Sequence, residues 1–246
     1  MEKENQIFGI RAIIEAIQAG KELDKVFLQK DAQGDLMRDL LKTMKQHKVN
    51  FTYVPVEKLN RLTTKNHQGA VASIAPVSFH DLETLVTNVL ESGKTPLFLI
   101  LDQLSDARNF GAIIRSAECM GIDAVLIPSK GSALATSDAM KASAGALNRI
   151  PICKTEQLKQ SLFYLQQSGL RIVACTEKAL VPLQETNLRG SVAIIMGSEE
   201  SGITQDLINL ADISCKIPMK GAISSLNVGV ATGMVLYEKI RQELVG

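Results

Sequence analysis

The alternation of strand-like and helical segments after Pro96 is the feature that most constrains the fold. Five short apolar runs predict strands there, at residues 97–101, 124–127, 171–174, 192–196 and 213–217. Helical stretches are expected among these runs, starting near Asn109, Thr136, Thr155, Thr204 and Ser224. Such alternation is typical of a parallel sheet with helices on its faces, and such sheets bind ligands at the carboxyl ends of their strands. We therefore predict an α/β fold with its chemistry in the loops that follow the strands.

The part of the chain before Pro96 is organised differently. Three apolar runs predict the strands of a small α/β domain over residues 1–75, at 25–29, 51–54 and 69–74. A helical pattern among them places four apolar residues on one face, Leu36, Leu40, Leu41 and Met44. Pro76 and Pro96 bracket a stretch whose apolar residues predict a short linking helix. We expect residues 76–95 to form a linker and residues 96–246 to form the second domain.

The net charge and the hydropathy of the chain exclude some classes of function. The 246 residues carry 27 basic and 26 acidic side chains, a net charge of +1, so the chain is no bulk polycation. Residues 1–75 carry 12 basic and 9 acidic side chains, a net charge of +3. This charge is compatible with binding to a polyanion such as RNA but does not by itself indicate it. No apolar run approaches the roughly 20 residues that cross a bilayer, and no apolar signal core follows the first residues. We expect no membrane contact and a cytoplasmic location.

Spacing excludes several familiar kinds of site. No two glycines lie two residues apart, so the GxGxxG turn of ordinary dinucleotide sites is absent. The histidines are scattered without ligand spacing, so we expect no metal site and no histidine-based triad; they are His47, His67 and His80. The cysteines lie within or beside apolar runs, which is typical of reduced thiols in a core; they are Cys119, Cys153, Cys175 and Cys215.

Three stretches, each following a predicted strand, carry polar side chains that indicate chemistry. In the first, residues 101–117, Asn109 can cap a helix whose first turn has bare backbone donors, and Arg115 lies six residues further on. A bound phosphate or ribose fits this arrangement. A helix cap followed by a surface arginine fits it equally well.

In the second stretch, residues 194–203, Gly197 and Gly202 frame the adjacent carboxylates of Glu199 and Glu200. Glycine is needed where the backbone turns sharply or approaches a ligand, and a carboxylate there can orient a hydroxyl or accept its proton. A tight acidic turn is the alternative interpretation.

In the third stretch, residues 217–231, Ser224 or Ser225 can start a helix that has Asn227 in its first turn. A helix cap alone explains one polar residue, but hardly both Ser225 and Asn227. The small residues Gly229, Ala231 and Gly233 favour close packing of this helix.

These three stretches, in this order, resemble the three signature motifs of the SpoU (TrmH-like) branch of the SPOUT methyltransferases, which transfer a methyl group from S-adenosylmethionine to a ribose 2′-hydroxyl of RNA. The resemblance covers the whole second domain. The front domain, at 7–12 and 66–72, looks like the L30e-like RNA-binding extension of the members that methylate guanosine in bacterial 23S ribosomal RNA. Ala107, Ser198 and Ser201 depart from the usual family pattern, whereas the polar signature positions are intact.

The resemblance implies a trefoil knot in the second domain, a homodimer, and S-adenosylmethionine as cofactor. It implies a catalytic set completed across the dimer interface, formed by Asn109, Arg115, Glu199, Ser225 and Asn227. It also implies cofactor contacts from Met196, Gly197, Ile217, Met219 and Leu226. Because a guanidinium has a pKa above about 12 and stays protonated, we expect Arg115 to grip an RNA phosphate or stabilise a developing alkoxide, while Asn109 and Glu199 orient the site.

Three functions compete at this point. The first is 2′-O-ribose methylation of a guanosine in 23S ribosomal RNA. The second is the same reaction on transfer RNA, because the charge of the front domain does not distinguish the two RNAs. The third is a catalytically silent RNA-binding or ribosome-assembly protein of the same fold, against which the intact polar positions argue.

Overall fold

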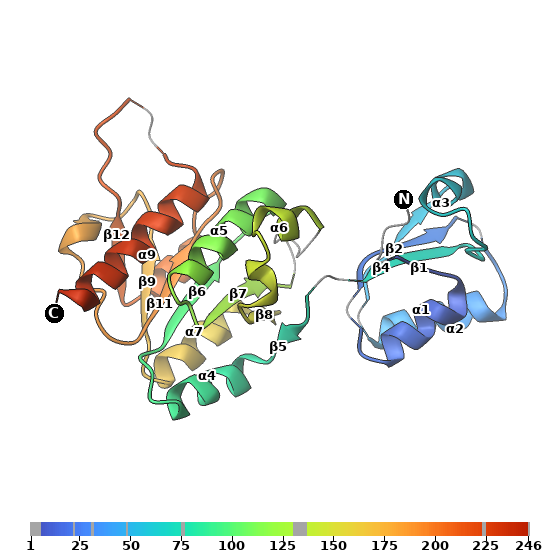
Figure 1. Ribbon diagram of the computed structural model, residues 1–246, viewed down its shortest axis with the longest axis horizontal. Coiled ribbons are helices and arrows are strands. Elements are labelled where there is room, and N and C mark those ends of the chain that lie inside the picture. The colour runs from blue at the N-terminus through green and yellow to red at the C-terminus, as the bar shows by residue number, and fades with distance from the viewer. Residues whose placement is uncertain are drawn as a thin grey trace. The chain divides into compact units, whose positions relative to one another are not determined.

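The computed structural model describes residues 6–21, 23–30, 32–47, 49–74, 77–129, 137–222 and 225–245. The chain separates into two compact units, Met1–Ser78 and Phe79–Gly246, and Figure 1 shows the elements of each. Pro76 and the helix starts expected near Thr136 and Ser224 lie outside the described residues.

The first unit is a four-stranded sheet with helices on both faces. Its elements are β1 Gln6–Phe8, α1 Ile10–Gln18, β2 Leu23–Gln29, α2 Asp35–Gln46, β3 Thr52–Val54, α3 Val56–Leu62 and β4 Ala70–Ile74. The strand order is β1-β4-β2-β3, in which only the β2 and β3 pair is parallel. Residues that alternate along β2 and β4 pack against α1 and α2 on one face and against α3 on the other (Figure 1).

The apolar face of α2 is turned slightly from the expected one. Met37, Leu40 and Met44 are buried, whereas Leu36 is 38% exposed. Met37, Leu40 and Met44 follow one another at spacings of three and four and define the buried face, whereas Leu36, four residues before Leu40, lies at the edge of that face. The short strand β1 was not expected from the sequence, because three residues are too few to show a period.

The second unit is an eight-stranded sheet in which every pair is parallel. Its strands are β5 Phe79–His80, β6 Leu97–Leu101, β7 Ala124–Pro128, β8 Ile152–Thr155, β9 Arg171–Cys175, β10 Val181–Pro182, β11 Val192–Met196 and β12 Ile213–Lys216. Its α-helices are α4 Leu82–Glu91, α5 Ala107–Cys119, α6 Ser137–Ala142, α7 Leu158–Gln167, α8 Gln205–Leu210 and α9 Val228–Leu244. The predicted α/β class with a parallel sheet is thus confirmed.

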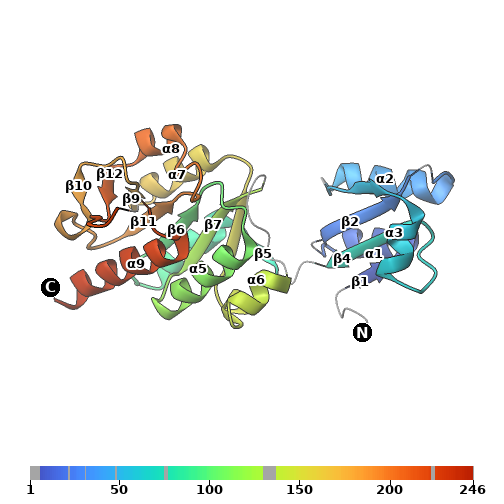
Figure 2. The ribbon, with the colours of Figure 1, turned by 90° about the horizontal axis from the view of Figure 1, so that it is seen from above.

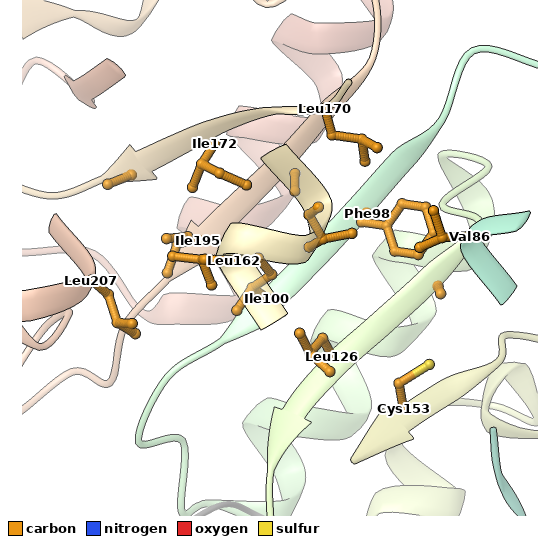
Figure 3. Packing of buried hydrophobic residues seen from close by; sticks show 14 of the residues in the cluster. Val86, Phe98, Ile100, Leu126, Cys153, Leu162, Leu170, Ile172, Ile195 and Leu207 are labelled. Atoms are coloured by element: carbon orange, nitrogen blue, oxygen red, sulfur yellow. The ribbon is translucent and has the colours of Figure 1, made fainter. Parts of the chain in front are cut away.

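Helices cover both faces of this sheet. Figure 2 shows α7 and α8 on one face and α5, α6 and α9 on the other. The core on the α7 side also includes Val86 and Val89 of α4. In Figure 3, Phe98 and Ile100 of β6 point into this core with Leu126, Ile172 and Ile195 of neighbouring strands. Because both faces are buried, the central strands are continuous apolar runs without polar alternation, as LFLIL in β6 and VAIIM in β11.

The strand order reverses direction between two central neighbours. It reads β10-β12-β9-β11-β6-β7-β8-β5, so the chain runs outward from β6 through β7 and β8 and then crosses to the other side of β6. Open parallel sheets bind ligands at the carboxyl ends of the strands where the order reverses. Here that point lies between β6 and β11, which the first and second polar stretches follow.

The segment expected to be a linker has a different structure. Phe79 and His80 form β5, which pairs with β8, and Val86 and Val89 of α4 are buried in the core of the second unit. An amphipathic helix has the same apolar period whether it links two domains or packs on one, so the sequence did not separate these cases.

The five strands predicted after Pro96 are present as β6, β7, β9, β11 and β12. β5 and β10 were not predicted because each is only two residues long, and β8 was not predicted because its sequence, ICKT, contains no apolar run. Strand order and pairing do not by themselves show how the chain is threaded, so the trefoil knot stays a prediction. Over the described ranges, no helix combines the length and the apolar character that crossing a membrane requires.

Candidate active site

Two of the polar stretches lie side by side because β6 and β11 are neighbours. Leu101 and Met196, the last residues of these strands, are paired, and the backbone N–H of Asp102 continues the pairing to the carbonyl of Met196 at 2.9 Å. The loop that precedes α5 and the loop that follows β11 therefore start at one place on the sheet edge.

Asn109 belongs to the first turn of α5 and does not cap it, which corrects the expectation from the sequence. Asp106 is the cap: its carboxylate accepts hydrogen bonds from the backbone N–H groups of Arg108, at 2.8 Å, and Asn109, at 2.7 Å. The side chain of Asn109 is thereby left to reach across to the next loop. Its Nδ2 donates to Oε1 of Glu199 at 3.0 Å.

Asn227 is the N-cap of α9, so the expected start at Ser225, with Asn227 in the first turn, is also corrected. Its Oδ1 accepts from the backbone N–H groups of Gly229, at 3.0 Å, and Val230, at 3.3 Å. Its Nδ2 donates to Oδ1 of Asn109 at 2.9 Å and to Oε1 of Glu199 at 2.7 Å. One residue therefore ends a loop, starts a helix and joins the other two polar stretches.

Glu199 is the centre of this cluster. Its Oε1 accepts hydrogen bonds from Asn109, from Asn227 and from the backbone N–H of Val228, the last at 3.1 Å. The N–H groups at a helix start lack partners within the helix, and Oε1 of Glu199 supplies one to the first turn of α9. Among the described residues, none donates a hydrogen bond to the other oxygen, Oε2.

Arg115 does not join the cluster. It is exposed on α5, six positions after Asn109, which is roughly 9 Å along a helix axis. None of the residues in the described ranges forms an ion pair or a hydrogen bond with its guanidinium. Within one chain, the structure therefore brings together Asn109, Glu199 and Asn227 and leaves Arg115 apart.

A cavity of about 410 Å³ opens next to the cluster, at the ends of β9, β11 and β12. All five residues expected to contact a cofactor line it: Met196, Gly197, Ile217, Met219 and Leu226. Ser225 and Glu199 also line it, which places the cluster at the cavity wall.

Gly197 is needed where it stands. A Cβ added to it would lie 2.1 Å from the carbonyl carbon of Gly202, and Ser198 and Gly202 form an isolated antiparallel bridge. Gly202 itself has φ +66°, a left-handed conformation that favours glycine. The loop that carries Glu199 and Glu200 is therefore folded tightly back on itself at the cavity wall.

The loop after β9 was not expected to contribute. Thr176, Glu177 and Lys178 line the cavity and add one negative and one positive charge. This loop contains no glycine, and its sequence does not resemble any of the three polar stretches. The general rule that ligands lie at strand carboxyl ends was the available signal, because the loop follows a predicted strand.

Of the four cysteines, Cys175 alone lines the cavity. Hydrogen bonding with Cys215 on the neighbouring strand, together with burial, raises the pKa of Cys175 above its ordinary value. Burial raises the pKa of Cys153 to about 12. Cys119 is exposed at the end of α5, which corrects the expectation that all four lie in the core. In the described part of the chain, no three metal-ligating side chains are grouped.

Comparison with known proteins agrees with this geometry. The sequence model of the SpoU rRNA Methylase family matches residues 96–237, and the model described as RNA 2′-O ribose methyltransferase substrate binding matches residues 6–80. The chain is 35% identical over 246 residues to the 23S rRNA (guanosine-2′-O-)-methyltransferase RlmB of Photobacterium profundum, covering 98% of this chain and 99% of that protein.

Two further proteins are similar to this chain over nearly its whole length, at lower sequence identity. YacO of Bacillus subtilis, of the TrmH family of tRNA/rRNA methyltransferases, is 29% identical over 241 residues, covering 98% of this chain and 97% of that protein. The crystal structure of an AdoMet-bound rRNA methyltransferase from Sinorhizobium meliloti superposes with a TM-score of 0.63 at 20% identity, covering 97% of this chain and 87% of that one. The chain belongs to the SpoU rRNA Methylase family and is a methyltransferase with a substrate-binding domain in front.

Proposed function

We propose that this enzyme methylates the ribose 2′-hydroxyl of a guanosine in 23S ribosomal RNA, with S-adenosylmethionine as methyl donor. The observation that carries the proposal is the joining of Asn109, Glu199 and Asn227 by hydrogen bonds at the wall of one cavity. The similarity to RlmB extends over both units and supports the 23S target. A ribosomal RNA substrate implies a cytoplasmic enzyme.

The cavity fits S-adenosylmethionine by size and by lining. Its volume of about 410 Å³ lies in the range of roughly 300–1,000 Å³ that is usual for small-molecule sites. Met196, Ile217 and Leu226 offer apolar surface for the adenine ring, and Glu177 and Lys178 offer charges for the polar groups of the amino-acid end. At Gly197, where a side chain has no room, the bare backbone can approach the ligand.

When bound, S-adenosylmethionine supplies an electrophilic methyl group on a positively charged sulfur. The protein has to hold the ribose hydroxyl in line and to remove its proton. In the proposed site, Oε1 of Glu199 is fixed by its three donors, and Oε2 orients the hydroxyl and accepts its proton. Asn109 and Asn227 are positioning residues, because they act on the nucleotide through the carboxylate. Ser225, which lines the same cavity, contributes a hydroxyl to the nucleotide side of the site.

Arg115 has a different task in this proposal. A guanidinium keeps its proton, so it is unsuited to be the base, and its planar set of donors matches a phosphate. Because Arg115 is exposed and separate from the cluster of its own chain, we assign it to the site of a second copy, where it grips the RNA backbone or stabilises the developing alkoxide.

A homodimer is supported by the exposed face of α9. Val230, Met234 and Tyr237 are 53%, 44% and 60% exposed and recur at helical spacing on one side of the helix. Gly229 and Gly233 of α9 face α5, because a Cβ built on them would meet the Cβ of Ala112 at 3.5 Å and Oγ of Ser116 at 3.9 Å, both ordinary contact distances. The apolar stripe and Arg115 therefore lie on adjoining helices. We propose that a second copy covers the stripe.

Transfer RNA is the second candidate substrate, because YacO is described as acting on tRNA or rRNA. The two are separated by offering the purified protein methyl-labelled S-adenosylmethionine with unmodified 23S RNA or with a pool of unmodified tRNA. The proposal expects labelled 2′-O-methylguanosine in 23S RNA alone. Label confined to tRNA would overturn the ribosomal target, and the absence of label from both RNAs would favour the catalytically silent interpretation.

A further inference from the structure

A second polar network involves the residues that precede and follow Glu199 and Glu200 in the loop after β11. Oγ of Ser198 and Oγ of Ser201 are 2.7 Å apart, and the backbone N–H of Ser201 donates to Oγ of Ser198 at 3.1 Å. Oγ of Ser201 also donates to Oε1 of Gln103 at 3.0 Å. The two serines flank Glu199 and Glu200, whereas Gln103 comes from the loop after β6.

Gln103 is tied to the far end of the same loop as well. Its Nε2 donates to Oγ1 of Thr204 at 2.6 Å. Thr204 is anchored in turn by Asp102, which is 4% exposed and whose Oδ2 accepts from the backbone N–H of Thr204, at 2.7 Å, and from its hydroxyl, at 2.6 Å. Ser201 and Thr204 are thus joined directly to the two residues that follow β6, and Ser198 is joined to them through Ser201.

The backbone of Gln103 is strained. Its φ is +54°, in the left-handed region that residues other than glycine adopt at a cost. Such a conformation persists only where the surroundings hold it, and it is concentrated at functional sites. Here the two side-chain hydrogen bonds, to Ser201 and to Thr204, hold Gln103 in this conformation.

We propose that Gln103, Ser198 and Ser201 are positioning residues that fix Glu199 for the methyl transfer. Glu199 is exposed, and its hydrogen bonds to Asn109 and Asn227 define its place only if the backbone beneath it is held as well. The serine pair and Gln103 supply that restraint. They connect the Glu199 loop to the strand end from which α5, and hence Asn109, begins. The inference rests on the proposed function, because it assigns Glu199 a role in that reaction.

The first test replaces Ser201. Ser201→Ala removes the link between Gln103 and Ser198, and we expect kcat to fall roughly tenfold, because a misplacement of about 1 Å costs up to about 10²-fold in rate. Ser201→Thr keeps the hydroxyl at an exposed position and should restore most of the rate. Ser168→Ala is the matched control, because it removes a hydroxyl that, within the described ranges, bonds only to the carbonyl of Tyr164, at 2.9 Å.

Binding measurements separate positioning from cofactor binding, since Ser198 and Ser201 also line the cavity. Calorimetry should give Ser201→Ala an S-adenosylmethionine affinity within about threefold of the parent protein. If the affinity fell as much as kcat, Ser201 would be a cofactor residue and the inference would be wrong.

The second test is a double-mutant cycle under single-turnover conditions. If Ser201 acts through Glu199, Ser201→Ala should slow the parent enzyme roughly tenfold and the Glu199→Gln enzyme less than about twofold. Equal slowing in both backgrounds would contradict the inference.

The third test separates two effects at Gln103, the loss of its side-chain hydrogen bonds and the relief of its backbone strain. Gln103→Gly and Gln103→Ala both remove the hydrogen bonds, but glycine also relieves the left-handed strain and should melt at a higher temperature than alanine. We expect both to lose rate equally. Recovery of the rate in Gln103→Gly would mean that only backbone strain matters.

A parent protein without RNA methyl transfer would refute the proposed function, whereas an active parent with fully active Ser201→Ala would refute this inference alone.

Discussion

At the scale of single residues, the active site depends on how one carboxylate is held. Glu199 receives three hydrogen bonds on one oxygen, from two asparagine side chains and from the start of α9. Hydrogen bonds to an ionised group are roughly twice as strong as those between neutral groups, so the cluster is specific for a carboxylate. In the proposed function, the other oxygen of Glu199 contacts the substrate.

Glu199→Gln tests this role while keeping the size of the side chain. We expect kcat to fall on the order of 10²-fold, because the variant loses the proton acceptor and the charge that orders the cluster. The affinity for S-adenosylmethionine, measured by calorimetry, should stay within about threefold, which also serves as the folding control. A variant with more than a third of the parent kcat would contradict the assignment.

Gly197→Ala tests the cofactor wall. The added Cβ would lie 2.1 Å from the carbonyl carbon of Gly202, closer than atoms can approach, so the loop has to move. We expect the S-adenosylmethionine affinity to fall at least about tenfold, since such overpacking typically costs about 1–3 kcal/mol. Gly221→Ala, at a position where an added Cβ meets nothing within 4 Å, is the matched control and should bind normally. Normal binding by Gly197→Ala would exclude the cavity as the cofactor site.

The sequence predicts the polar residues of this site better than their local tasks. Asn109, Glu199 and Asn227 were expected together from the motifs, and the structure places them in contact. The N-caps predicted for α5 and α9 are wrong. Several polar residues lie near the start of each helix, and their spacing does not show which of them is the cap. The sequence does not predict a role for Gln103, because a glutamine gives no indication of a left-handed backbone conformation.

At the scale of elements, α4 shows what fixes a helix to the second unit. Its N-cap Asp81 accepts hydrogen bonds from the backbone N–H of Thr84, at 2.9 Å, and from its hydroxyl, at 2.8 Å. Its buried side, at Val86 and Val89, joins the core that Figure 3 shows. The sequence predicts this helix but not its attachment, because attachment depends on which apolar surface is near in space.

Asp81→Ala should destabilise the second unit by about 1 kcal/mol at neutral pH, the usual cost of losing a helix cap. The bonds from Thr84 hold the pKa of Asp81 below its ordinary value of 3.8. A carboxyl whose pKa is lowered by folding stabilises the protein above its unfolded pKa and loses that effect as the pH falls through its folded pKa. The difference between Asp81→Ala and the parent, measured by calorimetric unfolding, should therefore shrink below about pH 4. A difference that stays constant down to pH 2 would contradict this explanation.

At the scale of the whole molecule, the site depends on the strand order and, in the proposed function, on a second copy of the chain. The alternation of elements predicts the parallel sheet, but the order of its strands is not encoded in any local pattern. That order brings β6 and β11 together, and with them residues 90 positions apart in the chain, Asn109 and Glu199. Only the resemblance of three motifs indicated that these loops converge.

Mixing two inactive variants tests whether Arg115 acts on the site of a second copy. In a dimer formed from one Arg115→Ala chain and one Glu199→Gln chain, one of the two sites combines an intact Arg115 with an intact Glu199. Random mixing of co-expressed chains should therefore restore about a quarter of the parent activity, where each variant alone has almost none. Mixed dimers isolated through two different tags but without activity would show that Arg115 serves its own chain.

The most direct measurement is a map of 2′-O-methyl groups in ribosomal RNA from cells that lack this protein. We predict that one 2′-O-methylguanosine of 23S RNA disappears, that the parent gene restores it, and that the Glu199→Gln gene does not. An unchanged 23S map, or a methyl group lost from transfer RNA instead, would contradict the proposed function.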